Sequence, residues 1–227
     1  MTIWLPLLTL IFSLIIGVPI YICMMVAGGV YFFINPSVGT FVIPQLINAG
    51  IMKFSLLAVP FFILSGVCMN ATGITKRLMN FCETLVGHLS GGLAHVNILL
   101  STLMGGLSGS NIADAAMEAK MLVPEMEKRG FSKAYSSVIT ACSALITPII
   151  PPGVGMILYA FIADVSVGKM FMAGFLPGIL MCLEQMALNS FISKKRGYAP
   201  IREKRASIKE IVKTGRTSIL ALFFPVI

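Results

Sequence analysis

Charged residues are scarce in this chain, and their scarcity excludes an ordinary soluble domain. Only 11% of the 227 residues are Asp, Glu, Lys or Arg, while 57% are hydrophobic. A soluble globular domain carries roughly 25% charged residues, and long apolar runs with so little polar relief are typical of segments that cross a bilayer. The sequence therefore predicts an all-α, polytopic membrane protein whose apolar surface contacts membrane lipid.

Patterns for metal binding and for a signal peptide are also missing. The five cysteines are scattered without a CxxC pair, and neither His88 nor His95 stands at metal-ligand spacing from them, so we expect free, buried thiols. The chain start has no basic segment, and its apolar run over residues 3–34 is far longer than a signal-peptide core, so it should be retained. A Gly-Val-Pro break at residues 17–19 makes that run either one long tilted span or two short ones.

Basic residues are present mainly in one segment. Residues 194–216 hold nine of the 17 Lys and Arg residues and lie between two apolar runs. In a soluble fragment such a cluster would suggest nucleic acid, but beside membrane segments it is explained by the excess of positive charge in cytoplasmic loops. We therefore predict a cytoplasmic loop and no nucleic-acid partner.

A glycine- and serine-rich break at residues 105–111 (Gly-Gly-Leu-Ser-Gly-Ser-Asn) separates two short apolar arms, residues 93–107 and 111–123. Each arm reaches only ~20 Å as a helix, less than the ~30 Å of a bilayer core. Basic residues precede the first arm and follow the second, which places both ends on one side of the membrane. The pattern predicts a re-entrant helical hairpin over residues 93–123, although a tight helix crossing would also use small residues.

A second break interrupts the apolar stretch 131–163, which we expect to form two half-helices. Pro148, Pro151 and Pro152 have no N–H, so the carbonyls of Ala144, Thr147 and Pro148 lose their helical donors. Bare carbonyls at the end of a half-helix carry partial negative charge and suit a small cation such as Na⁺. The alternative is a simple proline kink.

The N-termini of the two half-helices that follow these breaks favour an anion, because their N–H groups are not bonded within the helix. Hydroxyl and amide groups at the hairpin tip add further donors, and the sequence thus indicates cation-coupled uptake of an acid. Asp114 is an intramembrane acid and so a functional candidate. Glu118 stands one turn further on the same helical face. The alternative for both acids is pairing with Lys120, Lys128 or Lys133, or exposure near the interface, and it fits Glu118 better than Asp114, which is nearer the tip. The candidate substrate-binding residues are Ser108, Gly109, Ser110, Asn111, Asp114 and Gly153.

Ordered motifs at residues 106–116, 123–126, 128–131, 148–152 and 170–178 carry a resemblance to a known family. The first reads Gly-Leu-Ser-Gly-Ser-Asn-Ile-Ala-Asp-Ala-Ala and the fourth Pro-Ile-Ile-Pro-Pro. The chain resembles the large membrane subunit of tripartite ATP-independent periplasmic (TRAP) transporters, which belong to the ion-transporter superfamily of elevator carriers. Thr147, Gly153 and Asn111 depart from the usual glycine, serine and serine, and residues 119–120 (Ala-Lys) replace a common Gly-Ser pair.

The resemblance implies a Na⁺-coupled symporter in the bacterial inner membrane, multi-pass and without an organic cofactor. Its substrate would be an organic acid, such as a C4-dicarboxylate or sialic acid, delivered by a periplasmic substrate-binding protein, and a small four-helix membrane subunit would complete the assembly. One Na⁺ site would lie between the hairpin tip and the proline break. Its expected ligands are Ser108, Asn111, Thr147, Ile150 and Pro151.

The same resemblance implies an elevator-type architecture in which this chain is the first of two inverted repeats. Residues 1–87 would hold scaffold spans, including one at 54–69, and an amphipathic arm helix. Residues 88–163 would form the transport unit, 164–193 a further span, 194–216 the basic loop and 217–227 the start of a truncated second repeat.

Three rival functions remain open at the level of sequence. The chain could be another Na⁺-coupled carboxylate carrier of the same superfamily, or an assembly subunit without a transport path. It could also be an intramembrane aspartyl enzyme using Asp114 and Asp164, but neither residue stands in the Tyr-Asp or Gly-x-Gly-Asp context of such proteases. We expect no enzyme.

Overall fold

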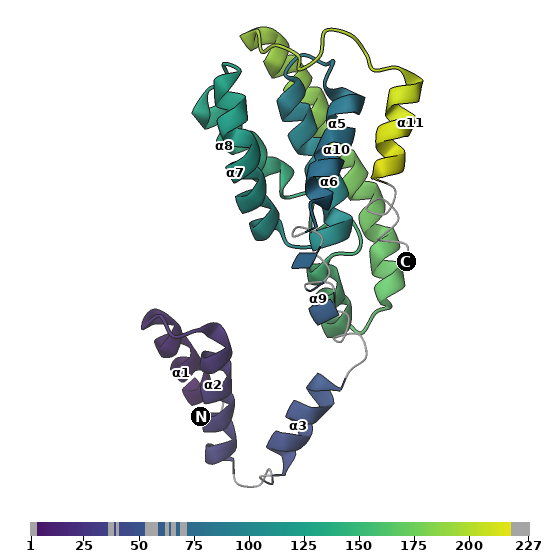
Figure 1. Cartoon of the computed structure of the whole chain (residues 1–227). Helices are drawn as coiled ribbons and strands as arrows, with labels where there is room; N and C mark the ends of the chain where they lie inside the picture. The colour runs from purple at the N-terminus through teal and green to yellow at the C-terminus, as the bar shows by residue number, and fades with distance from the viewer. Residues whose placement is uncertain are drawn as a thin grey trace. The chain divides into compact units, whose positions relative to one another are not determined.

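The computed structural model describes residues 4–35, 39, 41–52, 59–61, 64, 67–68 and 72–218, without the side chains of Ile51, Leu107 and Ser108. Every regular element in these ranges is an α-helix (Figure 1), as the all-α prediction requires. The predicted span at 54–69 and the predicted second repeat at 217–227 lie largely outside the described residues. The chain divides into two compact units, residues 1–53 and 54–227, which we describe separately.

The first unit contains two helices that pack against each other, α1 (Trp4–Ile15) and α2 (Ile20–Ile34), followed by α3 (Val42–Ile51). Gly17 adopts a left-handed φ of 85°, and Pro19 then begins α2, so the apolar run forms two short helices and not one long span. Most of the apolar side chains of α1 and α2 are exposed, which is the expected state of helices that contact lipid.

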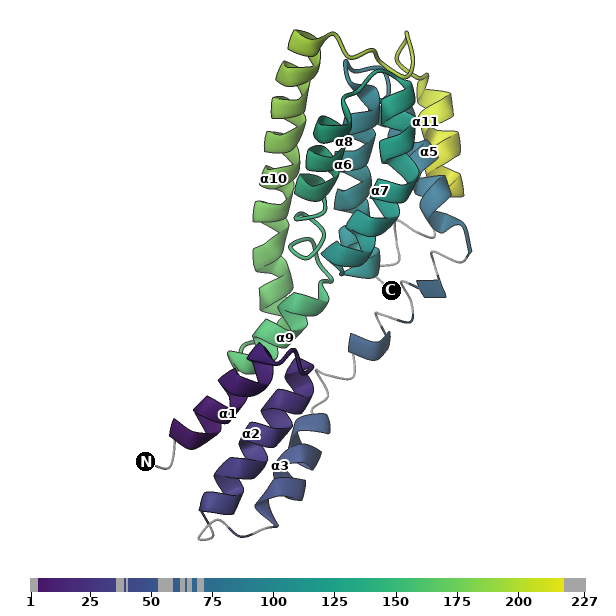
Figure 2. The ribbon, with the colours of Figure 1, turned by 90° about the vertical axis from the view of Figure 1, so that its left-hand side faces the viewer.

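The second unit is built around α6 (Gly92–Ser108), which packs against four other helices (Figures 1 and 2). Its side chains are buried nearly all round, because α6 carries apolar and small residues on every face. The neighbours of α6 are α5 (Ile74–Val86), α7 (Asn111–Lys128), α8 (Lys133–Ser143) and α10 (Val167–Arg196). The unit is completed by α9 (Val154–Ile162), which packs on α10, and α11 (Ile208–Thr217), which packs on α5.

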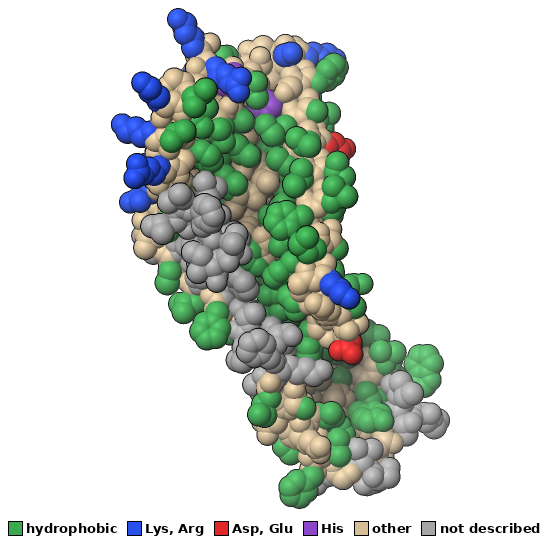
Figure 3. Space-filling view, turned by 90° about the vertical axis from the view of Figure 1, so that its right-hand side faces the viewer, with side chains coloured by type: hydrophobic (Ala, Val, Ile, Leu, Met, Phe, Trp, Pro, Cys, Tyr) green, Lys and Arg blue, Asp and Glu red, His purple; other side chains and the backbone are tan. Residues whose placement is uncertain are grey.

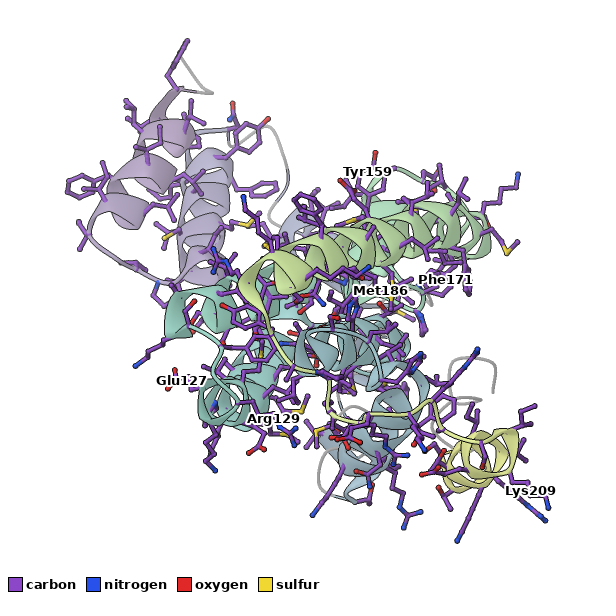
Figure 4. The ribbon with its side chains drawn as sticks, turned by 90° about the horizontal axis from the view of Figure 1, so that it is seen from above. Glu127, Arg129, Tyr159, Phe171, Met186 and Lys209 are labelled. Carbon is purple, nitrogen blue, oxygen red and sulfur yellow. The ribbon has the colours of Figure 1, made fainter. Side chains whose placement is uncertain are left out.

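Within the described ranges, α10 is the one helix long and apolar enough to cross a membrane by itself. Its 30 residues reach about 45 Å, and it continues through Pro177 and ends at Gly197, whose φ is 69°. Figure 4 shows Met186 on the side of α10 that faces the neighbouring helices, and Tyr159 of α9 on the outer face of the unit. Apolar side chains on the opposite side of α10, such as Leu183 and Phe191, are exposed.

The loop after α10 joins the start of α6 to the end of α7. The carbonyl of Tyr198 accepts a hydrogen bond from the N–H of Gly91 (3.0 Å), and the Tyr198 ring stacks on Phe131 with centroids 4.1 Å apart. Both ends of the α6–α7 hairpin therefore lie at the same end of the unit, where Lys and Arg side chains gather (Figure 3). On α5, burial raises the pKa of Glu83, and the nearby Arg129 and Arg202 act against that effect.

The second arm of the hairpin is longer than the sequence predicts. We expected it to end at Val123, before Pro124, but α7 continues to Lys128 and has 18 residues, or about 27 Å. Pro124 removes one hydrogen bond, and the buried side chains of Leu122 and Met126 on either side keep the helix packed on the core. Packing therefore outweighs the local preference of proline.

The five cysteines are free, as expected. Cys23, Cys82 and Cys182 are buried, whereas Cys142 is half-buried and Cys68 is exposed. The prediction that all five are buried is therefore wrong for Cys68 and only partly right for Cys142.

Candidate functional site

The tip of the hairpin is a tight reversal between α6 and α7. Gly109 ends α6 with a φ of 59°, a left-handed conformation that glycine adopts without strain. Ser110 then caps α7, and its hydroxyl accepts a hydrogen bond from the N–H of Ala113 at 3.5 Å. The Gly-Ser pair thus turns the chain within two residues.

The second break occupies residues 144–153, between α8 and α9. Its first residues form tight turns, in which the N–H of Ile146 donates to Ser143 O at 2.9 Å and that of Ile149 to Ile146 O at 3.0 Å. Among the described residues, no hydrogen bond ends on the carbonyls of Ala144, Thr147 or Pro148. These are the three carbonyls that the prolines deprive of donors.

Two glycines of the hairpin let it approach the second break closely. A Cβ atom on Gly105 would lie 2.7 Å from Ile150 Cβ and 2.9 Å from Thr147 O, closer than real Cβ contacts allow. A Cβ atom on Gly109 would lie 3.0 Å from the backbone N of Val154, at the start of α9. Glycine is therefore required at both positions for the hairpin tip and the break to meet.

The break is held from its other side by α10. A Cβ atom on Gly174 would lie 2.5 Å from Ile149 O, and one on Gly178 would lie 3.0 Å from Ile150 Cγ1. Residues 144–153 are thus clamped between the glycines of α6 and those of α10, and small residues permit such close helix contacts.

The structure brings most of the predicted site residues into this region. Thr147, Ile150, Pro151 and Gly153 are buried in the break, and Gly109 is buried at the tip. Ser110 and Asn111 are half-buried at the start of α7, while Asp114 is 1% exposed in its first turn. The backbone of Ser108 ends α6. Asp164, the other residue of the aspartyl alternative, is instead exposed in the turn after α9.

Backbone charge of both signs meets where the tip contacts the break. The unbonded carbonyls of Thr147 and Pro148 are partly negative, whereas the first N–H groups of α7 and α9 are partly positive. Gly153 begins α9 without a side-chain cap, and its backbone lies against Pro148, so that a Cβ atom there would be 2.6 Å from Pro148 O. The region can therefore offer oxygen ligands to a cation and N–H donors to a carboxylate.

A buried polar network, which the sequence did not reveal, ties the hairpin to α8 and to the break. Asn97 on α6 donates to the hydroxyl of Thr140 on α8 (2.6 Å) and accepts from that of Ser143 (3.1 Å). The hydroxyl of Thr147 donates to the backbone carbonyl of Ser101 at 3.3 Å. These bonds join α6 to the chain on both sides of residue 144.

Glu118 differs most from its predicted environment. The sequence allows Glu118 to pair with a lysine or to be exposed near the interface, but it is 0% exposed and bonded to Ser101, and Lys128 pairs with Glu125 instead (3.7 Å). The interpretation as a lysine pair is therefore wrong. Ser101 and Glu118 are equally far in sequence from the turn at residues 109–110, so pairing the antiparallel arms about their tip would have found the contact.

Comparison with known proteins gives a consistent result. The family model described as the DctM component of the tripartite ATP-independent periplasmic transporter matches residues 7–227. The chain is 38% identical to the sialic acid TRAP transporter large permease protein SiaM of Vibrio cholerae, over 93% of this chain and 49% of that protein. It is 37% identical to the sialic acid TRAP transporter permease protein SiaT of Haemophilus influenzae, over 100% of this chain and 36% of that protein. It is also 37% identical to the 2,3-diketo-L-gulonate TRAP transporter large permease protein YiaN of Escherichia coli, over 93% of this chain and 49% of that protein. It spans half or less of the length of these relatives.

Proposed function

Because this chain belongs to the DctM family of TRAP transporter permeases, we propose that it forms part of a Na⁺-coupled symporter for an organic acid. The observation that carries the proposal is the contact between the hairpin tip and the proline break, where Gly105 and Gly109 meet residues 147–154. The relatives are named as permeases and not as enzymes, which agrees with the expectation that the chain is not an enzyme.

In this proposal Na⁺ binds at the oxygen atoms of the break and of the tip. The carbonyls of Thr147, Ile150 and Pro151 accept no hydrogen bond among the described residues, and the break lies in close contact with glycines of α6 and α10. Oxygen ligands from backbone and hydroxyl groups suit a hard cation, and broken transporter helices bind Na⁺ in this way. The proposed ligands are Ser108, Asn111, Thr147, Ile150 and Pro151.

The acid is proposed to bind beside this cation site. The N-termini of α7 and α9 supply N–H donors for its carboxylate, and the residues involved are Ser108, Gly109, Ser110, Asn111 and Gly153. Asp114 would accept hydrogen bonds from hydroxyl groups of the substrate, since an acidic side chain does not suit the substrate's carboxylate. The relatives that transport sialic acid and 2,3-diketo-L-gulonate support an acid as the substrate class.

The proposed mechanism is an elevator movement. The α6–α7 hairpin would be re-entrant and would move with the broken helix against scaffold helices, which include α1 and α2. A periplasmic binding protein would deliver the acid, and a small four-helix membrane subunit would complete the transporter. The basic segment around the end of α10 would face the cytoplasm, and the protein would lie in the bacterial inner membrane.

Asn111 and Ser108 provide the test of the cation site. In the full-length permease, assembled with its partner components in proteoliposomes, we expect Asn111→Ala and Ser108→Ala to reduce Na⁺-dependent uptake about tenfold, the equivalent of ~1.4 kcal/mol. The apparent Na⁺ affinity should fall, because oxygen ligands are removed. Uptake is measured as a function of Na⁺ concentration.

The matched control is Ser137→Ala, which removes a hydroxyl group from an exposed position of α8 and should leave uptake unchanged. Normal Na⁺-coupled uptake in both the Asn111 and the Ser108 variants would remove the hairpin tip from the mechanism.

A further inference from the structure

A carboxyl group is sealed inside the hairpin, away from the proposed cation ligands. Glu118 on α7 and Ser101 on α6 are both 0% exposed. The Ser101 hydroxyl oxygen lies 2.9 Å from one carboxyl oxygen of Glu118 and 2.7 Å from the other, so both are within hydrogen-bond distance. The two side chains thus form one closed contact between the two arms.

The two distances have a consequence for the protons in this contact. A serine hydroxyl carries a single proton, so it can donate one full hydrogen bond and no more. If Glu118 is ionised, that proton is shared between two acceptors. If Glu118 is protonated, its O–H donates to Ser101 while the Ser101 O–H donates to the other carboxyl oxygen, and both contacts are satisfied.

The ionisable groups around Glu118 also favour its protonated form, because none of those described is a basic partner for it. Asp114, one turn earlier on α7, is a second acidic side chain and not a basic partner, and α5 contributes the buried thiol of Cys82. On α6, His95 lies about 9 Å further along the helix, and on α8 the ionisable residues are Lys133, which is exposed, and Tyr135, which bonds to Asn189. The ion pairs formed among the described residues use Glu125 and Glu210, not Glu118.

An ionised carboxylate buried without a basic partner costs several kcal/mol. We propose that Glu118 is a proton-binding site of the hairpin, protonated while α6 and α7 are packed as described and deprotonated when water reaches the pair. In the deprotonation step the O–H bond of Glu118 breaks, the proton passes to water, and a carboxylate remains beside the unchanged Ser101 hydroxyl. The inference uses the packing of the hairpin and does not depend on Na⁺ coupling.

The proton would also act on the neighbouring break. Ser101, the partner of Glu118, accepts the hydrogen bond of Thr147 through its backbone carbonyl. Loss of the proton weakens the contact between the arms, because one of the two reciprocal hydrogen bonds disappears and the carboxylate that remains is more stable in water than buried. Opening of the hairpin and release of the proton from Glu118 are therefore coupled.

Infrared difference spectroscopy of the purified full-length permease tests the protonation directly. We expect a C=O stretching band of a protonated carboxylic acid at neutral pH, which shifts in deuterated water and is absent in Glu118→Gln. Glu125→Gln is the matched control, because Glu125 lies on the same helix but is paired with Lys128 and Arg129 at the surface. An identical band in the wild type and in Glu118→Gln would overturn the proposal.

Thermal unfolding against pH gives a second, independent measurement. Glutamine has the shape of the protonated acid, so Glu118→Gln should fold. The proton is bound in the packed hairpin, so the stability it confers is present at low pH and lost as the pH rises. The melting temperature of the wild type should fall more steeply with rising pH than that of Glu118→Gln, while Glu125→Gln follows the wild type. Equal slopes in the wild type and Glu118→Gln would count against the proposal.

Discussion

At the scale of single residues, the contact between the hairpin and the break depends on glycine, which has no Cβ atom. Gly105 contacts the backbone carbonyl of Thr147 and the branched carbon of Ile150, neither of which is the flexible end of a side chain. A methyl group at this position has nowhere to go unless α6 and the break move apart. The sequence indicated this region from its glycine, serine and proline residues, but not that Gly105 lies directly against the break.

We predict that Gly105→Ala separates the hairpin from the break. Overpacking of this kind destabilises a protein by about 1–3 kcal/mol, and the melting temperature of the purified permease should fall accordingly. Gly155→Ala is the control, because a Cβ atom there meets nothing within 4 Å and alanine favours the helix. An unchanged melting temperature in Gly105→Ala would contradict this prediction, because it would show that the break accommodates the methyl group without loss of stability.

Residues also differ in how far the sequence reveals their role. The turn at Gly109 and the end of α8 before Pro148 could be predicted, since glycine and proline act on their own backbone. The burial of Glu118 could not, because it depends on Ser101 seventeen residues away and on the packing of two helices. The effect of a residue on its own backbone can be predicted from the sequence alone. A contact between the two arms of a hairpin can be predicted only when the register of the arms is known.

At the scale of elements, α7 shows packing overriding a local signal. Pro124 is exposed within the helix and removes the hydrogen bond to the carbonyl of Lys120. Tertiary contacts of the flanking buried residues hold the helix together. The sequence predicted the start of α7 at Asn111 correctly, from the glycine- and serine-rich break, and its end wrongly, from its proline.

Replacing Pro124 with alanine should therefore stabilise α7. The new N–H restores one hydrogen bond, worth about 1 kcal/mol, and little packing is lost because Pro124 is exposed. Amide hydrogen exchange over residues 117–128 of the permease should become slower. Glu127→Ala, an exposed change in the same turn that adds no hydrogen bond, is the control. Faster exchange in Pro124→Ala would indicate that the proline sets a bend the helix needs.

At the scale of the whole second unit, two contact regions lie at opposite ends of the hairpin. One is the glycine contact at the tip. The other is the aromatic contact at the base, where Tyr198 stacks on Phe131 and contacts Tyr135 in a tilted arrangement, with centroids 5.5 Å apart in the second pair. The hydroxyl of Tyr198 accepts only long hydrogen bonds, of 3.4 Å, from Ser132 and Arg196. The ring, more than the hydroxyl, joins α10 to the hairpin.

Two substitutions of Tyr198 separate these contributions. Tyr198→Ala removes the stacked ring and should lower the free energy of unfolding by about 2 kcal/mol, from lost area and ring contact. Tyr198→Phe keeps the ring and should cost well under 1 kcal/mol. Denaturant or thermal unfolding of the two variants measures the difference, and equal effects would assign the stabilisation to the hydroxyl.

The glycine contacts also tie the break to α10 within the second unit. Gly174 and Gly178 fit against Ile149 and Ile150 as closely as Gly105 does from the opposite side. Such close contacts, with the Ile149 carbonyl at Gly174 and with the Ile150 side chain at Gly178, cannot slide without opening voids. If the broken helix moves as proposed above, these contacts would carry α10 with it, and the hinges would lie outside the block formed by α6, the break and α10.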